Sequence, residues 1–60
     1  MPSDETRRVL KVFGVAVTNL EDAIDKKAAL DEIMKWDGEL ADRTREVLAL
    51  VERLRSRRLQ

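Results

Sequence analysis

Apolar residues recur in this chain at alternating steps of three and four positions, in two series separated by a short polar break. The first series consists of Leu10, Phe13, Val17, Leu20 and Ile24, and the second of Leu40, Val47, Val51 and Leu54. Such steps place side chains on one stripe of an α-helix, and a seven-residue repeat makes that stripe a seam for another helix. The pattern predicts an all-α fold, a small helical hairpin, with these residues forming an oligomer interface.

The break at Trp36-Asp37-Gly38 predicts the turn of the hairpin. Glycine ends helices because it accepts the left-handed conformation, and aspartate is a strong cap for a following helix. After the break, acidic residues come first and arginines last, which matches the dipole of a helix at both of its ends. We therefore expect helical arms at about residues 4–35 and 39–58.

Three features of the first arm refine this expectation. Ser3 is a good N-cap, and the two acidic residues after it suit the positive end of the helix dipole. The run Thr18-Asn19-Leu20-Glu21 is typical of a capping box, so the arm is either continuous or kinked near Thr18. The phase of the apolar pattern shifts near Asp25-Lys26-Lys27, which indicates either a local unwinding or an alternative position for the turn.

Residues 9–17 are almost continuously apolar and rich in valine, which favours a strand. The spacing of Leu10, Phe13 and Val17 nevertheless continues in phase into a region with helical periodicity, so we interpret the segment as a helix. Its apolar residues cannot all face one partner helix, and a lone hairpin offers only one. We therefore expect the hairpin to associate as a homodimer into a four-helix bundle, with a partner that is itself, a larger protein, or both.

A second interpretation treats residues 9–17 as a strand followed by helices at about 19–36 and 39–58. That order is similar to the order of elements in ribbon-helix-helix regulators, which place a β-ribbon in the major groove of DNA. Such a ribbon must present hydrogen-bonding side chains to the bases, and between Lys11 and Thr18 this segment has none. A small DNA-binding transcriptional regulator is therefore the alternative function, and nucleic acid is not the partner that we expect.

The composition restricts the chemistry. The chain has 60 residues, with no cysteine and no histidine. A chain of this length buries only about 60% of the surface that its unfolded form exposes, so disulfides, a metal or a partner usually stabilise it. Disulfides are excluded, and the common nucleophile–base pairs and metal sites cannot be assembled. We expect one domain over residues 1–60, stabilised by association, that is not an enzyme and has no catalytic residue, metal or cofactor.

Twelve basic and twelve acidic residues give a net charge of zero, which argues against a protein that coats nucleic acid. Candidate partner contacts are Trp36 and the arginines near the end of the chain, Arg53, Arg55, Arg57 and Arg58. Trp36 either closes the helical core or anchors an interface, and the arginines either complement the helix dipole or contact a charged partner. We expect a non-enzymatic protein–protein interaction or oligomerisation module, a small adaptor or regulatory subunit.

The sequence also carries an expectation about location. No apolar run approaches the roughly 20 residues of a membrane span. The first residues include acids and show no secretory pattern. We therefore expect a cytoplasmic protein without membrane contact.

Overall fold

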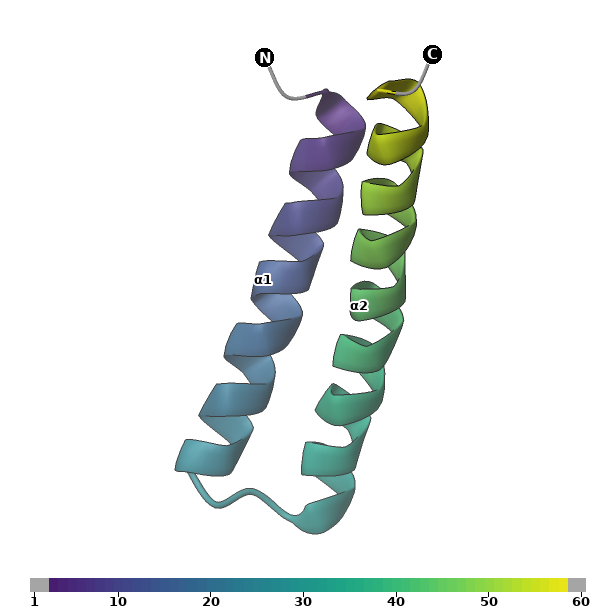
Figure 1. Cartoon of the computed structure of the whole chain (residues 1–60). Helices are drawn as coiled ribbons and strands as arrows, with labels where there is room; N and C mark the ends of the chain where they lie inside the picture. Colours follow the sequence, from purple (N-terminus) through teal and green to yellow (C-terminus); the bar gives the residue numbers. More distant parts are fainter. Residues whose placement is uncertain (1–2, 59–60) are drawn as a thin grey trace.

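The computed structural model describes residues 3–58 and shows two antiparallel helices joined by a short loop (Figure 1). Helix α1 (Asp4–Asp25) has 22 residues and helix α2 (Leu30–Arg58) has 29. The helices lie side by side in an elongated molecule of 48 × 18 × 12 Å, with the two chain ends together at one end and the loop at the other. The predicted all-α helical hairpin is confirmed. Because residues 9–17 lie within α1, the interpretation of that segment as a strand is wrong.

The hairpin turns at residues 26–29, and the predicted turn at Asp37-Gly38 is wrong. Both of these residues lie in the interior of α2, and Gly38 does not have a positive φ. A glycine costs a helix interior about 1 kcal/mol relative to alanine. The partial burial of Trp36 and Leu40 on the same stretch of α2 offsets a cost of that size. A single glycine is therefore no barrier when the helix around it packs against a neighbour.

The predicted arms at residues 4–35 and 39–58 consequently have the wrong division. The first arm ends ten residues earlier, and the second begins nine residues earlier, than the sequence predicted. The observed loop coincides with the phase shift near Asp25-Lys26-Lys27, which the sequence offered as the alternative position.

Helix α1 ends in a Schellman motif, a pair of backbone hydrogen bonds that closes the last turn. The N–H of Ala28 donates to the carbonyl of Ala23 at 2.9 Å, and the N–H of Lys27 donates to the carbonyl of Ile24 at 3.0 Å. The motif needs a residue in the left-handed conformation, and Lys27 supplies it with a φ of 56°. Glycine usually occupies this position because a side chain there costs about 1–2 kcal/mol. The absence of glycine explains why the sequence showed no stop signal.

The first helix begins as predicted and is continuous at Thr18. The Ser3 Oγ accepts a hydrogen bond from the N–H of Thr6 at 3.1 Å, which confirms Ser3 as the N-cap. Of the two alternatives that the sequence left open at Thr18, the continuous arm is the one observed, because α1 is not interrupted there. The Thr18 hydroxyl donates to the carbonyl of Gly14 at 2.9 Å and so is not used as a cap.

Two ion pairs define the register of the helices. Glu5 pairs with Arg53 at 2.6 Å near the chain ends, and Lys26 pairs with Glu32 at 3.3 Å at the loop. In each pair the residue numbers add up to 58, so residue i of α1 lies level with residue 58 − i of α2. This rule places any residue of one helix beside its neighbours on the other.

The line of contact between the helices, which we call the seam, contains residues at alternating steps of three and four. On α1 it consists of Val9, Val12, Ala16, Asn19 and Ala23, and on α2 of Ile33, Trp36, Leu40, Arg43, Val47, Leu50 and Leu54. All are buried or partly buried except Leu54, at the end where the chain termini lie. Among the described residues, only Ala16, Ala23 and Leu50 are buried. The core is therefore small, and its α1 side consists of small and medium side chains.

We expect Gly38→Ala to stabilise the protein by about 0.5–1 kcal/mol, because alanine loses less conformational freedom than glycine on entering a helix. A Cβ atom added at Gly38 meets nothing within 4 Å, so no clash opposes this gain. Urea unfolding at one fixed protein concentration measures the change. A loss of stability would show that Gly38 is needed as a turn residue.

We expect Lys27→Gly to stabilise the protein by about 0.5–1 kcal/mol, because glycine adopts the left-handed conformation without strain. Lys26→Gly is the matched control, since Lys26 has a φ of −87° and gains no such relief. The control variant should lose stability in the same unfolding assay. Equal losses in both variants would contradict the assigned end of α1.

Candidate interaction surface

A second stripe of residues lies beside the seam on each helix, one position further along the chain. One residue turns an α-helix by about 100°, so this stripe points sideways from the seam. Because the helices are antiparallel, a step to the next residue rotates clockwise on one helix and anticlockwise on the other when both are viewed from the same end. The two stripes therefore lie on the same side of the hairpin. They consist of Leu10, Phe13, Val17, Leu20 and Ile24 on α1, and of Met34, Asp37, Ala41, Thr44, Leu48, Val51 and Arg55 on α2. We call this side of the hairpin the apolar face.

Five bulky side chains of the apolar face are open to solvent, whereas Phe13, Leu20 and Val51 on the same face are partly buried. Leu10 is 50% exposed, Val17 40%, Ile24 53%, Met34 62% and Leu48 60%. A shallow hollow of about 220 Å³ lies among the α1 members, with two carboxylates beside it; its lining is Val17, Leu20, Glu21, Ile24 and Asp25. Large side chains at alternating steps of three and four beside a hollow are typical of a surface that receives another helix.

The opposite side of the hairpin, which we call the charged face, holds the residues that precede the seam positions. On α1 these are Arg8, Lys11, Val15, Thr18 and Asp22, and on α2 Glu32, Lys35, Glu39, Asp42, Glu46, Ala49 and Arg53. The ion pairs between the helices involve this face, and so do the pairs of Arg43 with Glu39 at 3.5 Å and with Glu46 at 3.1 Å. One face of the hairpin is therefore solvated and the other is apolar.

The surface area of the hairpin is large for its mass. The solvent-accessible area is 4974 Å² for a chain of 6.9 kDa, whereas a compact monomer of this mass exposes about 4,000 Å². The radius of gyration is 14.2 Å, against about 10 Å for a compact domain of this length. The excess of about 1,000 Å² is close to the area that one partner of a standard interface buries, about 800 Å².

The structure divides the residues that the sequence assigned to an oligomer interface. The α1 series, Leu10, Phe13, Val17, Leu20 and Ile24, lies on the apolar face together with Val51. Leu40, Val47 and Leu54 lie instead in the seam, where they contribute to the packing of the hairpin itself. The role of the exposed residues in association stays a prediction.

The sequence reasoning missed the α1 side of the seam. The series Val9, Val12, Ala16, Asn19 and Ala23 has the same spacing as the bulkier series one position later, which masked it. It also missed Met34 and Leu48, whose separation of two heptads on α2 was a usable signal.

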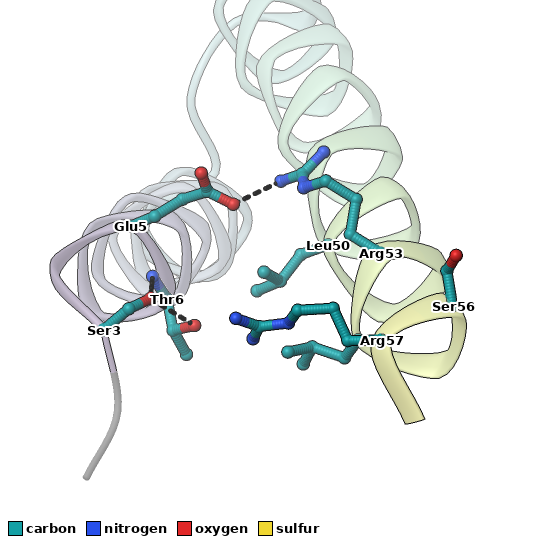
Figure 2. Close-up of a pocket in the computed structure, with 8 residues that line it drawn as sticks. Ser3, Glu5, Thr6, Leu50, Arg53, Ser56 and Arg57 are labelled. Atoms are coloured by element: carbon teal, nitrogen blue, oxygen red, sulfur yellow. Dashed lines mark hydrogen bonds and ion pairs between the residues drawn. The ribbon is translucent and has the colours of Figure 1, made fainter. Parts of the chain in front are cut away.

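The arginines near the chain ends have different surroundings, and Figure 2 shows Arg53 and Arg57 among them. Arg53 binds Glu5 across the helices, and Arg55 binds Glu52 on its own helix at 3.2 Å. The Arg57 side chain extends between the helices toward α1, in a hollow of about 430 Å³. Arg58 is exposed at the last turn. The first two arginines thus already have carboxylate partners within the hairpin.

Trp36 lies in the seam and is partly buried. The Lys35 Nζ is 4.8 Å from the centre of its ring, a cation–π arrangement. Because α2 continues past it, Trp36 does not close the core beside a turn, as one sequence interpretation had it. Its use as an interface anchor, like partner contacts of Arg53, Arg55, Arg57 and Arg58, stays a prediction.

Neither a metal site nor a membrane-spanning helix is found among the described residues, and the comparisons with known proteins gave no relative. Residues 3–58 contain no group of three side chains that could hold a metal ion. Within the same residues neither helix has the length and apolar character to cross a membrane. Comparison with protein-family models, curated proteins and solved structures found no match to the chain. The geometry of the hairpin is therefore the basis for any proposal about its function.

Arg43 is the most unusual member of the seam. Its side chain is only 25% exposed, and its Nε is buried and donates to no protein group. The register rule places it level with Val15 and Ala16, so we expect its partly buried stem to cover the small side chain of Ala16. The carboxylates of Glu39 and Glu46 receive its charged end at the edge of the seam.

We expect Arg43→Met to leave stability unchanged or to raise it by about 1 kcal/mol, since methionine keeps the stem and removes a partly buried charge. Arg43→Ala should cost about 1–2 kcal/mol, because it removes the stem that covers Ala16. Thermal unfolding of both variants at one concentration provides the comparison. If methionine were as harmful as alanine, the ion pairs rather than the stem would be the important contribution.

Proposed function

We propose that this chain is a non-enzymatic oligomerisation module, in which two hairpins stack apolar face against apolar face as a four-helix bundle. In this role it is a small adaptor or regulatory subunit. The observation that carries the proposal is the stripe of bulky residues on α1, of which Leu10, Val17 and Ile24 are exposed.

The division of residues between the seam and the apolar face supports association. The seam uses Ala16 and Ala23, which allow the helices to approach closely but bury little apolar surface. The larger side chains, Leu10, Val17 and Ile24, are left outside. Burial of each such side chain contributes roughly 1.5–3 kcal/mol. Covering several of them provides the stabilisation that a hairpin of 60 residues lacks on its own.

The area and the shape of the apolar face favour a second copy as the occupant. A two-fold axis places the same patch on both partners, so an apolar patch meets an apolar patch without a second kind of surface. The hairpin exposes about 1,000 Å² more than a compact monomer, enough for a standard interface. Each helix then has neighbours on two sides, as in other four-helix bundles.

The alternative function, a DNA-binding regulator, required residues 9–17 to form a strand of a β-ribbon. Residues 9–17 are helical and in phase with the rest of α1. The charged face carries both signs of charge rather than a basic stripe. We therefore do not propose it.

A pair of valines on α1 provides a matched test. Val17 lies on the apolar face and is 40% exposed, whereas Val15 lies on the charged face and is 52% exposed. Val17→Asp should raise the dimer dissociation constant more than a hundredfold, since it places an unpaired charge in the interface, a cost of about 3–5 kcal/mol. Val15→Asp should change it by less than about threefold.

Sedimentation equilibrium at micromolar concentration measures these constants. The unmodified chain and the Val15→Asp variant should sediment as dimers, and the Val17→Asp variant as a monomer with reduced helicity. A folded, concentration-independent monomer for the unmodified chain would contradict the proposal.

A further inference from the structure

The charge of the hairpin is unevenly distributed along its length. Residues 3–12 and 48–58, at the end that holds the chain termini, carry seven basic and three acidic side chains. Residues 13–47, toward the loop, carry five basic and nine acidic side chains. A molecule with zero net charge is thus positive by four charges at one end and negative by four over the rest.

Two apolar faces can stack about a two-fold axis in two ways. An axis along the hairpin places both loops at the same end, with α1 over α2 of the second copy. An axis across the hairpin places the loops at opposite ends, with α1 over α1 and α2 over α2. Neighbouring helices are antiparallel in both arrangements, so helix dipoles do not distinguish them. Side chains and charge must decide.

The charge distribution favours loops at opposite ends. With both loops at one end, the basic ends of the two copies face each other, and so do the acidic parts. With loops at opposite ends, the basic end of each copy lies over the acidic part of the other. The axes of packed helices lie about 8–10 Å apart, close to the screening length of about 8 Å at physiological ionic strength. Charges at the edges of the interface therefore still interact across it, more strongly than those on the charged face.

The α2 stripe of the apolar face supports the same arrangement independently. Centred on Glu46, the stripe pairs Asp37 with Arg55, Ala41 with Val51, and Thr44 with Leu48, and its first residue, Met34, falls opposite Arg58. The residue numbers in each pair add up to 92. The three inner pairs are complementary, because an acid meets a base in the first and a small side chain meets a larger one in the other two. The Thr44 hydroxyl already donates to the Leu40 carbonyl at 2.8 Å, so it needs no partner in the interface.

We infer that two copies stack with their loops at opposite ends, about a two-fold axis that passes α2 near Glu46. Asp37 of each copy then pairs with Arg55 of the other at the edges of an apolar interface. By the register rule the axis passes α1 near Val12, which brings Leu10 of one copy close to Phe13 of the other, places Leu20 over the first turn of the other α1 and leaves Ile24 beyond that turn. This inference rests on the proposed dimer and specifies its geometry.

A distance measurement tests the orientation directly. The chain has no cysteine, so Ser56→Cys provides one spin label per protomer at an exposed position near the chain ends. Ser56 lies ten residues from Glu46, so loops at opposite ends separate the two labels by about 30 Å along the bundle, at 1.5 Å per residue. A separation of about 30 Å or more supports the inference. A separation of about 20 Å or less in a dimer overturns it but leaves the proposed function intact, whereas a monomer would overturn both.

A charge exchange tests the pairing. Asp37→Arg and Arg55→Asp should each weaken the dimer about tenfold, and the double variant should recover most of that loss. Asp42→Arg is the control, since Asp42 lies on the charged face and binds Arg45 of its own helix. It should change the dissociation constant by less than about threefold, because its side chain points away from the interface. Additive losses in the double variant would overturn the pairing of Asp37 with Arg55.

Discussion

Helix α1 carries two adjacent apolar stripes, and α2 can cover only one of them. The stripe that α2 covers contains Ala16 and Ala23, and the stripe left outside contains Leu10, Val17 and Ile24. Small residues in the seam let the helix axes come close. The consequence is a hairpin whose own core is thin and whose bulky α1 side chains Leu10, Val17 and Ile24 are exposed. The form of the molecule and the proposed assembly both depend on this choice of stripe.

Ion pairs fix the register of the two helices, because apolar contacts alone would allow one helix to shift along the other. Within the hairpin, the Glu5–Arg53 and Lys26–Glu32 pairs mark the two ends of the seam. Each pair is exposed and contributes little to stability by itself. Their effect is to select one register, since a shift of either helix would separate both pairs. The proposed pairing of Asp37 with Arg55 would apply the same device between two copies.

The sequence was sufficient for the helices and insufficient for the turn. The heptad spacing identified α1 and α2 as helices because the period of an apolar stripe depends only on helix geometry. The turn depends on a left-handed backbone conformation, which the residue types in the loop do not indicate. Lys27 adopts a left-handed φ without being glycine, while Gly38 is a glycine in an ordinary helical position. Tertiary packing decided both cases against local propensity.

The candidate surface was recognised only in part for a related reason. Periodicity shows which residues share a stripe, but it does not show which of two adjacent stripes faces the neighbouring helix. The sequence assigned both apolar series to one oligomer interface, whereas Leu40, Val47 and Leu54 of the second series lie in the seam. Within the hairpin, α2 packs instead against the smaller α1 residues Val9, Val12 and Ala16. The outward position of the larger set became visible only from the exposure of each residue.

The central claim is that folding of this hairpin is coupled to association with a second copy. The most direct test follows helicity by circular dichroism during thermal unfolding over a hundredfold range of protein concentration. Mass action predicts that the unfolding midpoint rises by roughly 10 °C across this range for a dimer of this size. A midpoint that stays constant across the range would show that the hairpin folds alone and would contradict the account.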